Sequence, residues 1–99
     1  GSTMADLLET PGDSHSGELE TSIMLHLAPE LVKGRSPRET PKFPAPIMVR
    51  RKTAYWPGGV NGNPEAASEY KGAELFQRGK RALIELVKKV AVFEEAETD

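Results

Sequence analysis

The sequence predicts one part of an α/β domain: two amphipathic helices joined by a long irregular crossover, with a sheet from elsewhere covering their apolar faces. Apolar residues recur at three- and four-residue steps in two segments, which is the spacing of amphipathic helices. The stretch between these segments is rich in Gly and Pro. Two helices and such a crossover do not make a convincing core, so we expect them to pack on a surface outside this chain.

The first helix is predicted from about Glu20 to Val32, and Gly34 is placed to end it. Its apolar stripe is formed by Leu19, Ile23, Met24, Leu27 and Leu31. His26 lies between two leucines of this helix, and we interpret it as a partly exposed helix residue rather than as a ligand.

The crossover spans residues 33–67, of which ten are Gly or Pro. Only Ile47–Val49 and Tyr55–Trp56 have the composition of short strands. Residues 56–62 are rich in Gly but lack the Lys-Ser/Thr pair that follows a phosphate-binding loop, so we predict a turn there with Trp56 as a packing anchor. A loop of this length is typical of a functional segment, or of one that packs on a partner.

A second, longer helix is predicted to begin near the N-cap Ser68 and to fray into the acidic tail, Glu94 to Asp99. Gly72 and Gly79 fall on its apolar face, and each costs about 1 kcal/mol relative to Ala in a helix interior. We therefore expect another backbone to approach this face closely. Lys71 belongs to the charged face, which we interpret as solvated. The apolar face consists of Gly72, Leu75, Phe76, Gly79, Ala82, Leu83, Leu86, Val87 and Val90.

The composition argues against several classes of partner. A net charge of −2 speaks against nucleic acid and against a membrane surface, and no apolar run approaches the roughly 20 residues of a membrane helix. The absence of cysteine excludes disulfides, thiolate metal sites and cysteine nucleophiles. We expect a soluble, cytoplasmic protein in which His, Asp or Glu would hold any metal.

The candidate chemistry lies in residues 13–20. This stretch contains His15 and three carboxylates, Asp13, Glu18 and Glu20, around a flexible glycine. Such a set can bind a divalent metal or transfer protons. The same carboxylates also favour the first turn of a helix, so a capping role stays open. A catalytic metal normally takes three or more protein ligands, so this chain would supply only part of a site.

The motif also resembles a known family. Residues 15–25, His-Ser-Gly-Glu-Leu-Glu-Thr-Ser-Ile-Met-Leu, are similar to the signature of the creatininase (creatinine amidohydrolase) family. Residues 28–32 resemble the end of the helix that follows in that family, and residues 59–64 with 67–72 resemble its last loop and C-terminal helix. The resemblance extends over about residues 12–92.

This resemblance implies the C-terminal part of a layered α/β/α fold, represented here by two helices and a long irregular crossover. It implies a divalent metal, Zn or Mn with Fe as a third candidate, whose ligands come mostly from an N-terminal polypeptide that carries a Glu-x-His pair and an Asn-Gly-His segment. The implied activity is hydrolysis of a C–N bond, other than a peptide bond, in a small cyclic amide or formamide. The implied assembly is a homo-oligomer acting on a small-molecule substrate.

The resemblance also implies roles for four residues. His15 corresponds to a histidine that donates a proton to the leaving nitrogen. Glu18 would be a metal ligand or a base that orients water. Asp13 would hydrogen-bond to a metal ligand or contact the substrate, and Glu20 would orient the loop by accepting hydrogen bonds from backbone N–H groups.

The expected organisation has three parts. Residues 1–11 are a remnant of tag removal, beginning with Gly1-Ser2, and an N-terminal linker; residues 12–93 are the creatininase-like part; residues 94–99 are an acidic tail. Two other interpretations remain: a non-catalytic interaction or regulatory subunit that keeps the family's helices, and one subunit of a split enzyme.

Overall fold

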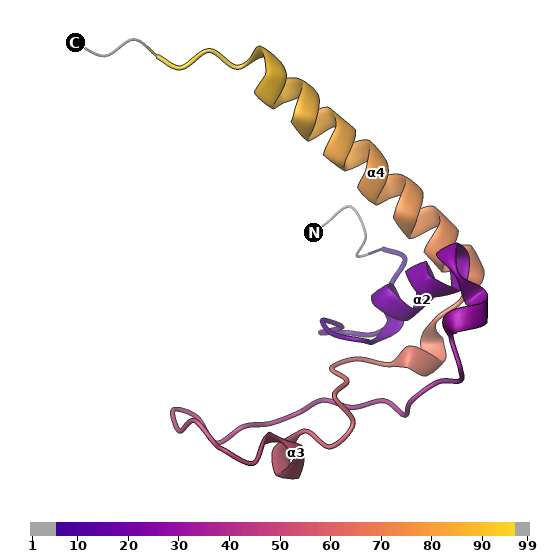
Figure 1. Ribbon diagram of the computed structural model, residues 1–99, viewed down its shortest axis with the longest axis vertical. Coiled ribbons are helices and arrows are strands. Elements are labelled where there is room, and N and C mark those ends of the chain that lie inside the picture. Colours follow the sequence, from indigo (N-terminus) through magenta and orange to yellow (C-terminus); the bar gives the residue numbers. More distant parts are fainter. Residues whose placement is uncertain (1–5, 97–99) are drawn as a thin grey trace.

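The computed structural model describes residues 6–96, so Gly1-Ser2 and the end of the acidic tail, residues 97–99, lie outside the described part. Helix α2 (Glu18–Leu27) packs beside the beginning of the long helix α4 (Glu69–Val92), as Figure 1 shows. Between them the chain makes two single 3-10 turns, η1 (Pro29–Leu31) and η2 (Pro64–Ala66), and one short helix, α3 (Lys52–Tyr55).

Helix α2 begins two residues earlier and ends five residues earlier than the sequence pattern predicts. It begins at Glu18 because the Asp13 carboxylate accepts hydrogen bonds from the first backbone N–H groups of the helix. It ends at Leu27 because Pro29 has no N–H to continue the ladder and disfavours helical backbone at Ala28. The prediction that Gly34 ends this helix was wrong.

Helix α4 agrees with its predicted start. The Ser68 side chain accepts a hydrogen bond from the Lys71 backbone N–H at 3.2 Å, as an N-cap does. Gly72 is buried, and a Cβ atom there would collide with the Ser22 carbonyl oxygen of α2. This confirms the close backbone approach predicted at Gly72. Gly79 lies further along, in an apolar hollow of about 320 Å³ between the two helices.

The described residues contain no β-strand, only two isolated bridges, His15–Asn61 and Glu39–Gly62. The two predicted strands were wrong: residues 47–49 are irregular, and Tyr55 ends α3. A strand needs a neighbour to complete its hydrogen bonds, and among the described residues neither segment forms a β-bridge. The sheet of the expected α/β class therefore remains a prediction about a partner surface.

Among residues 6–96, no helix combines the length and the apolar character needed to cross a membrane.

Candidate active site around His15

Asp13 organises the loop that carries His15. Its carboxylate accepts hydrogen bonds from the backbone N–H groups of Glu18, at 2.6 Å, and of Leu19, at 3.2 Å. A Cβ atom at either Gly17 or Gly62 would collide with this carboxylate. The two glycines therefore make room for Asp13, and the carboxylate caps α2, where a negative charge also complements the helix dipole.

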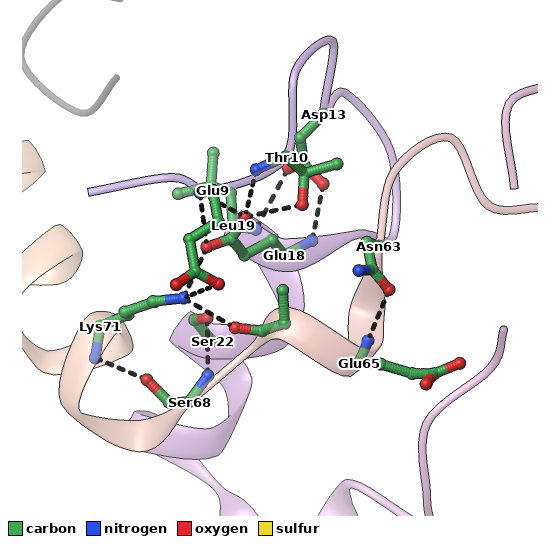
Figure 2. A network of polar contacts seen from close by, with 11 residues as sticks. Glu9, Thr10, Asp13, Glu18, Leu19, Ser22, Asn63, Glu65, Ser68 and Lys71 are labelled. Atoms are coloured by element: carbon green, nitrogen blue, oxygen red, sulfur yellow. Dashed lines mark hydrogen bonds and ion pairs between the residues drawn. The ribbon is translucent and has the colours of Figure 1, made fainter. Parts of the chain in front are cut away.

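Glu18 is fully buried, and its carboxylate is held by four donor groups (Figure 2). The Glu9 backbone N–H contacts its two oxygens at 2.9 and 3.0 Å. The Thr10 N–H and Oγ1 donate at 2.9 and 2.8 Å, and Lys71 Nζ donates at 2.8 Å. Burial raises the pKa of Glu18, but the hydrogen bonds from Lys71, Glu9 and Thr10 outweigh it, so the pKa is lowered.

Lys71 ties α4 to this network. Its ammonium contacts Glu18 at 2.8 Å, Glu9 Oε2 at 3.1 Å and the Ala66 carbonyl oxygen at 2.9 Å. Burial lowers the pKa of Lys71, but its ion pairs with Glu18 and Glu9 outweigh it and raise the pKa. The interpretation of Lys71 as a solvated residue was therefore wrong. One clue was available, because Lys71 lies one turn before the apolar Leu75 and so shares its side of the helix.

His15 lies at the open rim of the loop. Its main chain pairs with Asn61: the His15 N–H donates to the Asn61 carbonyl at 3.1 Å, and the Asn61 N–H donates back at 2.8 Å. The side chain is exposed, and its ring lies edge-on to Trp56 with centroids 5.4 Å apart. The imidazole is thus free to meet a substrate while its backbone is fixed.

Glu20 accepts a hydrogen bond from the Ser16 backbone N–H at 3.0 Å, which is the kind of contact expected of it. Ser16 has a positive φ of 51°, so this bond holds an uncommon backbone conformation directly after His15. The second histidine, His26, lies apart from this loop and packs against Phe76 of α4, with ring centroids 5.7 Å apart.

Within the part of the chain that the structure describes, no three His, Asp or Glu side chains gather where one metal ion could bind. These residues therefore do not fit a divalent metal by themselves. The prediction that Glu18 is a metal ligand stays a prediction, and its contacts in this chain are those of an anchor. Sequence reasoning missed the roles of Glu9, Thr10 and Lys71, which hold the motif. It identified Trp56 as a packing anchor but missed its contact with His15.

The sequence was compared with known proteins. It matches the creatininase family, described as creatinine amidohydrolase, over residues 3–87. It is 36% identical over 70 residues to the mycofactocin precursor peptide peptidases of two Mycobacterium tuberculosis strains, CDC 1551 / Oshkosh and ATCC 25618 / H37Rv. That alignment covers 66% of this chain and 28% of each relative, so the chain spans less than a third of their length. No solved structure matches it significantly. The family match covers most of the chain, and the chain belongs to the creatininase family.

Proposed function

We propose that this chain is the His15-bearing part of a creatininase-family hydrolase that cleaves an amide C–N bond. The observation that carries the proposal is the state of His15, an exposed imidazole on a fixed backbone. Asn61 holds its main chain on one side, and the Asp13-capped start of α2 follows on the other. A side chain held this way loses little freedom when it meets a substrate.

The proposed role of His15 is proton transfer to the leaving nitrogen. In hydrolysis the C–N bond breaks, the hydroxyl of a water molecule bonds to the carbonyl carbon, and the nitrogen departs with a proton. Histidine suits this step because it changes charge between about pH 5 and 8. Asp13 and Glu18 are engaged in holding the loop, whereas the His15 side chain is exposed and can reach a substrate.

The substrate class is part of the proposal. The family resemblance implies a small cyclic amide or formamide, whereas the relatives in Mycobacterium tuberculosis are named for a precursor peptide. The amide C–N bond is common to both classes. We therefore propose amide hydrolysis as the shared chemistry and expect a panel of cyclic amides, formamides and short peptides to identify the substrate.

A divalent metal, Zn or Mn, is retained in the proposal. Its ligands would have to come from outside residues 6–96, from the N-terminal part of the fold and the homo-oligomer that the family resemblance implies. We accordingly expect the 99-residue chain to bind Zn²⁺ or Mn²⁺ weakly in calorimetry. Tight binding at one ion per chain would show that it carries a complete site.

The two histidines of the chain provide a matched test. In the complete enzyme, His15→Ala is expected to lower kcat by about 10²- to 10⁴-fold, the usual cost of losing a general acid. His26→Ala is the control, because His26 packs on Phe76 away from the loop. Metal content is measured in parallel for His15→Ala and Glu18→Gln. Unchanged turnover in His15→Ala would refute the proposed role, and loss of metal in Glu18→Gln alone would restore Glu18 as a ligand.

A second candidate is a non-catalytic interaction subunit. It is favoured by the exposed apolar residues on the C-terminal half of α4, among them Leu83, Leu86 and Val90. This candidate predicts that the chain binds its partner equally well with and without His15, and that no substrate of the panel is turned over.

A further inference from the structure

The long crossover has a use that its irregular sequence does not reveal. We propose that it builds a wall for the site and that Trp56 is a positioning residue for His15, holding the imidazole in its reactive direction. This inference rests on the proposed function of His15 in proton transfer. It explains why the segment before α4 is long yet ordered around a few specific contacts.

The first step concerns how Trp56 is fixed. Its indole N–H donates a hydrogen bond to the Val60 carbonyl at 2.7 Å. The Phe43 ring meets the indole nearly at a right angle, 88°, with centroids 6.1 Å apart. The indole thus has a polar tether on one side and an aromatic neighbour on another, which limits its rotamers.

The second step concerns the loop that holds both rings. This loop consists of residues 58–62. Its Val60 carbonyl accepts the hydrogen bond from Trp56, and its Asn61 main chain pairs with that of His15. Glu39, in the earlier part of the crossover, binds this loop. Its carboxylate accepts from the Val60 N–H at 3.2 Å and the Gly58 N–H at 3.3 Å, and its main chain pairs with Gly62 at 2.8 and 3.0 Å.

The His15 and Trp56 side chains also contact each other. Both residues are hydrogen-bonded to the loop of residues 58–62, and their ring centroids lie 5.4 Å apart at an interplanar angle of 62°. An exposed histidine without such a neighbour would sample several rotamers. The indole therefore restricts the side-chain torsions of His15, whereas Asn61 restricts only its backbone.

The contact can be tested without any substrate, because Trp56 is the single tryptophan of this chain. The fluorescence of an indole depends on the groups that touch it, and the His15 and Trp56 ring centroids lie 5.4 Å apart. Emission of the complete protein is recorded, and the signal of a Trp56→Phe variant is subtracted to isolate Trp56. We expect the Trp56 emission to change in His15→Asn and to stay the same in His26→Asn.

The positioning role is tested by turnover. Trp56→Ala is expected to lower kcat by about 10- to 100-fold with a smaller change in KM, because a misdirected proton donor slows the chemical step. Trp56→Phe keeps an aromatic face and should restore much of this loss. Glu39→Ala keeps the indole but loosens the loop that holds it, so it should also lower kcat.

Two results would overturn the inference: a Trp56 emission that is the same in His15→Asn as in the parent, or a Trp56→Ala variant that changes KM alone. Failure of the proposed function looks different. If His15 is not the proton donor, His15→Ala keeps its turnover, although the Trp56 emission still responds to the loss of His15.

Discussion

The two halves of α4 have the same apolar periodicity but very different surroundings. In the N-terminal half Leu75 is fully buried against α2, whereas in the C-terminal half Leu83, Leu86 and Val90 are 61%, 57% and 68% exposed. Figure 1 shows the second half extending away from the remainder of the chain. A periodic pattern therefore specifies the helix and its face, but burial depends on a neighbour that only the first half has among the described residues.

The N-terminal half of α4 is also fixed by polar contacts to other described residues. The Ser68 backbone N–H donates to Ser22 Oγ at 3.1 Å, and Lys71 reaches the buried Glu18. Together with the close approach at Gly72, these contacts define the angle and register at which α4 leaves α2. The His15 motif is therefore anchored by specific hydrogen bonds more than by buried apolar surface.

The largest expected effect on stability is that of breaking the buried ion pair. Glu18→Ala removes the acceptor for the Glu9 and Thr10 N–H groups and leaves the Lys71 ammonium with the Ala66 carbonyl oxygen and the exposed Glu9 carboxylate. Removing one partner of a buried pair typically costs about 3–5 kcal/mol. Urea unfolding of the purified protein measures this loss in the free energy of unfolding.

The control for this variant is Glu74→Ala, which removes an i,i+4 pair with Arg78 on the same helix. Such surface pairs contribute about 0.3–0.5 kcal/mol. Equal costs for Glu18→Ala and Glu74→Ala would show that the network around Glu18 is not what anchors the motif.

The next effect tests the backbone approach between the helices. Gly72→Ala places a methyl group against the Ser22 carbonyl oxygen, so α2 and α4 must move apart. Overpacking of this kind typically costs about 1–3 kcal/mol, although alanine is otherwise the better helix former. Gln77→Ala, at an exposed site of α4, should stay within about 0.5 kcal/mol. A more stable Gly72→Ala protein would mean that the helices are not in close contact.

A smaller effect comes from changing the ionisation of the pair by pH. The pKa of Glu18 is lowered in the folded state, so its contribution to stability is present above the unfolded-state pKa and is lost as pH falls through the folded-state value. The pKa of Lys71 is raised, so its contribution is lost only as pH rises through its folded-state pKa at the alkaline end. Unfolding midpoints followed from neutral to acid pH should fall less steeply in Glu18→Gln than in the parent. Parallel curves would contradict this assignment.

Local rules predicted the beginning of α4 and the contact at Gly72 well. Ser68 could be identified as an N-cap because its hydrogen bond reaches only three residues ahead. Gly72 could be identified as a close approach because a glycine on the apolar face of a helix indicates one, although its partner Ser22 could not be named. The end of α2 was placed too late, because the apolar stripe continues to Leu31 and hides the effect of Pro29. The family membership was also predicted correctly, since the motif of residues 15–25 is contiguous.

The parts of the candidate site that sequence reasoning missed depend on distant residues. A carboxylate beside His15 looks the same in sequence whether it faces a metal or, as Glu18 does, a lysine 53 residues later. Trp56 was identified as an anchor, but its partner His15 lies far before it in the sequence, with α2 and most of the crossover between them. Contacts between residues that are distant in the sequence leave no periodic pattern in it. Such contacts decide whether a residue like Glu18 anchors the loop or binds a metal.

The smallest effect on the folded junction, and the sharpest test of the comparison, concerns the exposed half of α4. A triple variant in which Leu83, Leu86 and Val90 are each changed to Gln should alter the stability of the α2–α4 junction by no more than about 0.5 kcal/mol per site. The reason is that these side chains are more than half exposed. The same change should reduce self-association of the 99-residue chain in analytical ultracentrifugation, since exposed apolar patches drive association. Glu85→Gln, on the same turns of the helix, leaves the apolar stripe intact and serves as the control. If the triple variant unfolds far more easily than the control, this half of α4 is already packed on a neighbour, and the difference between the two halves disappears.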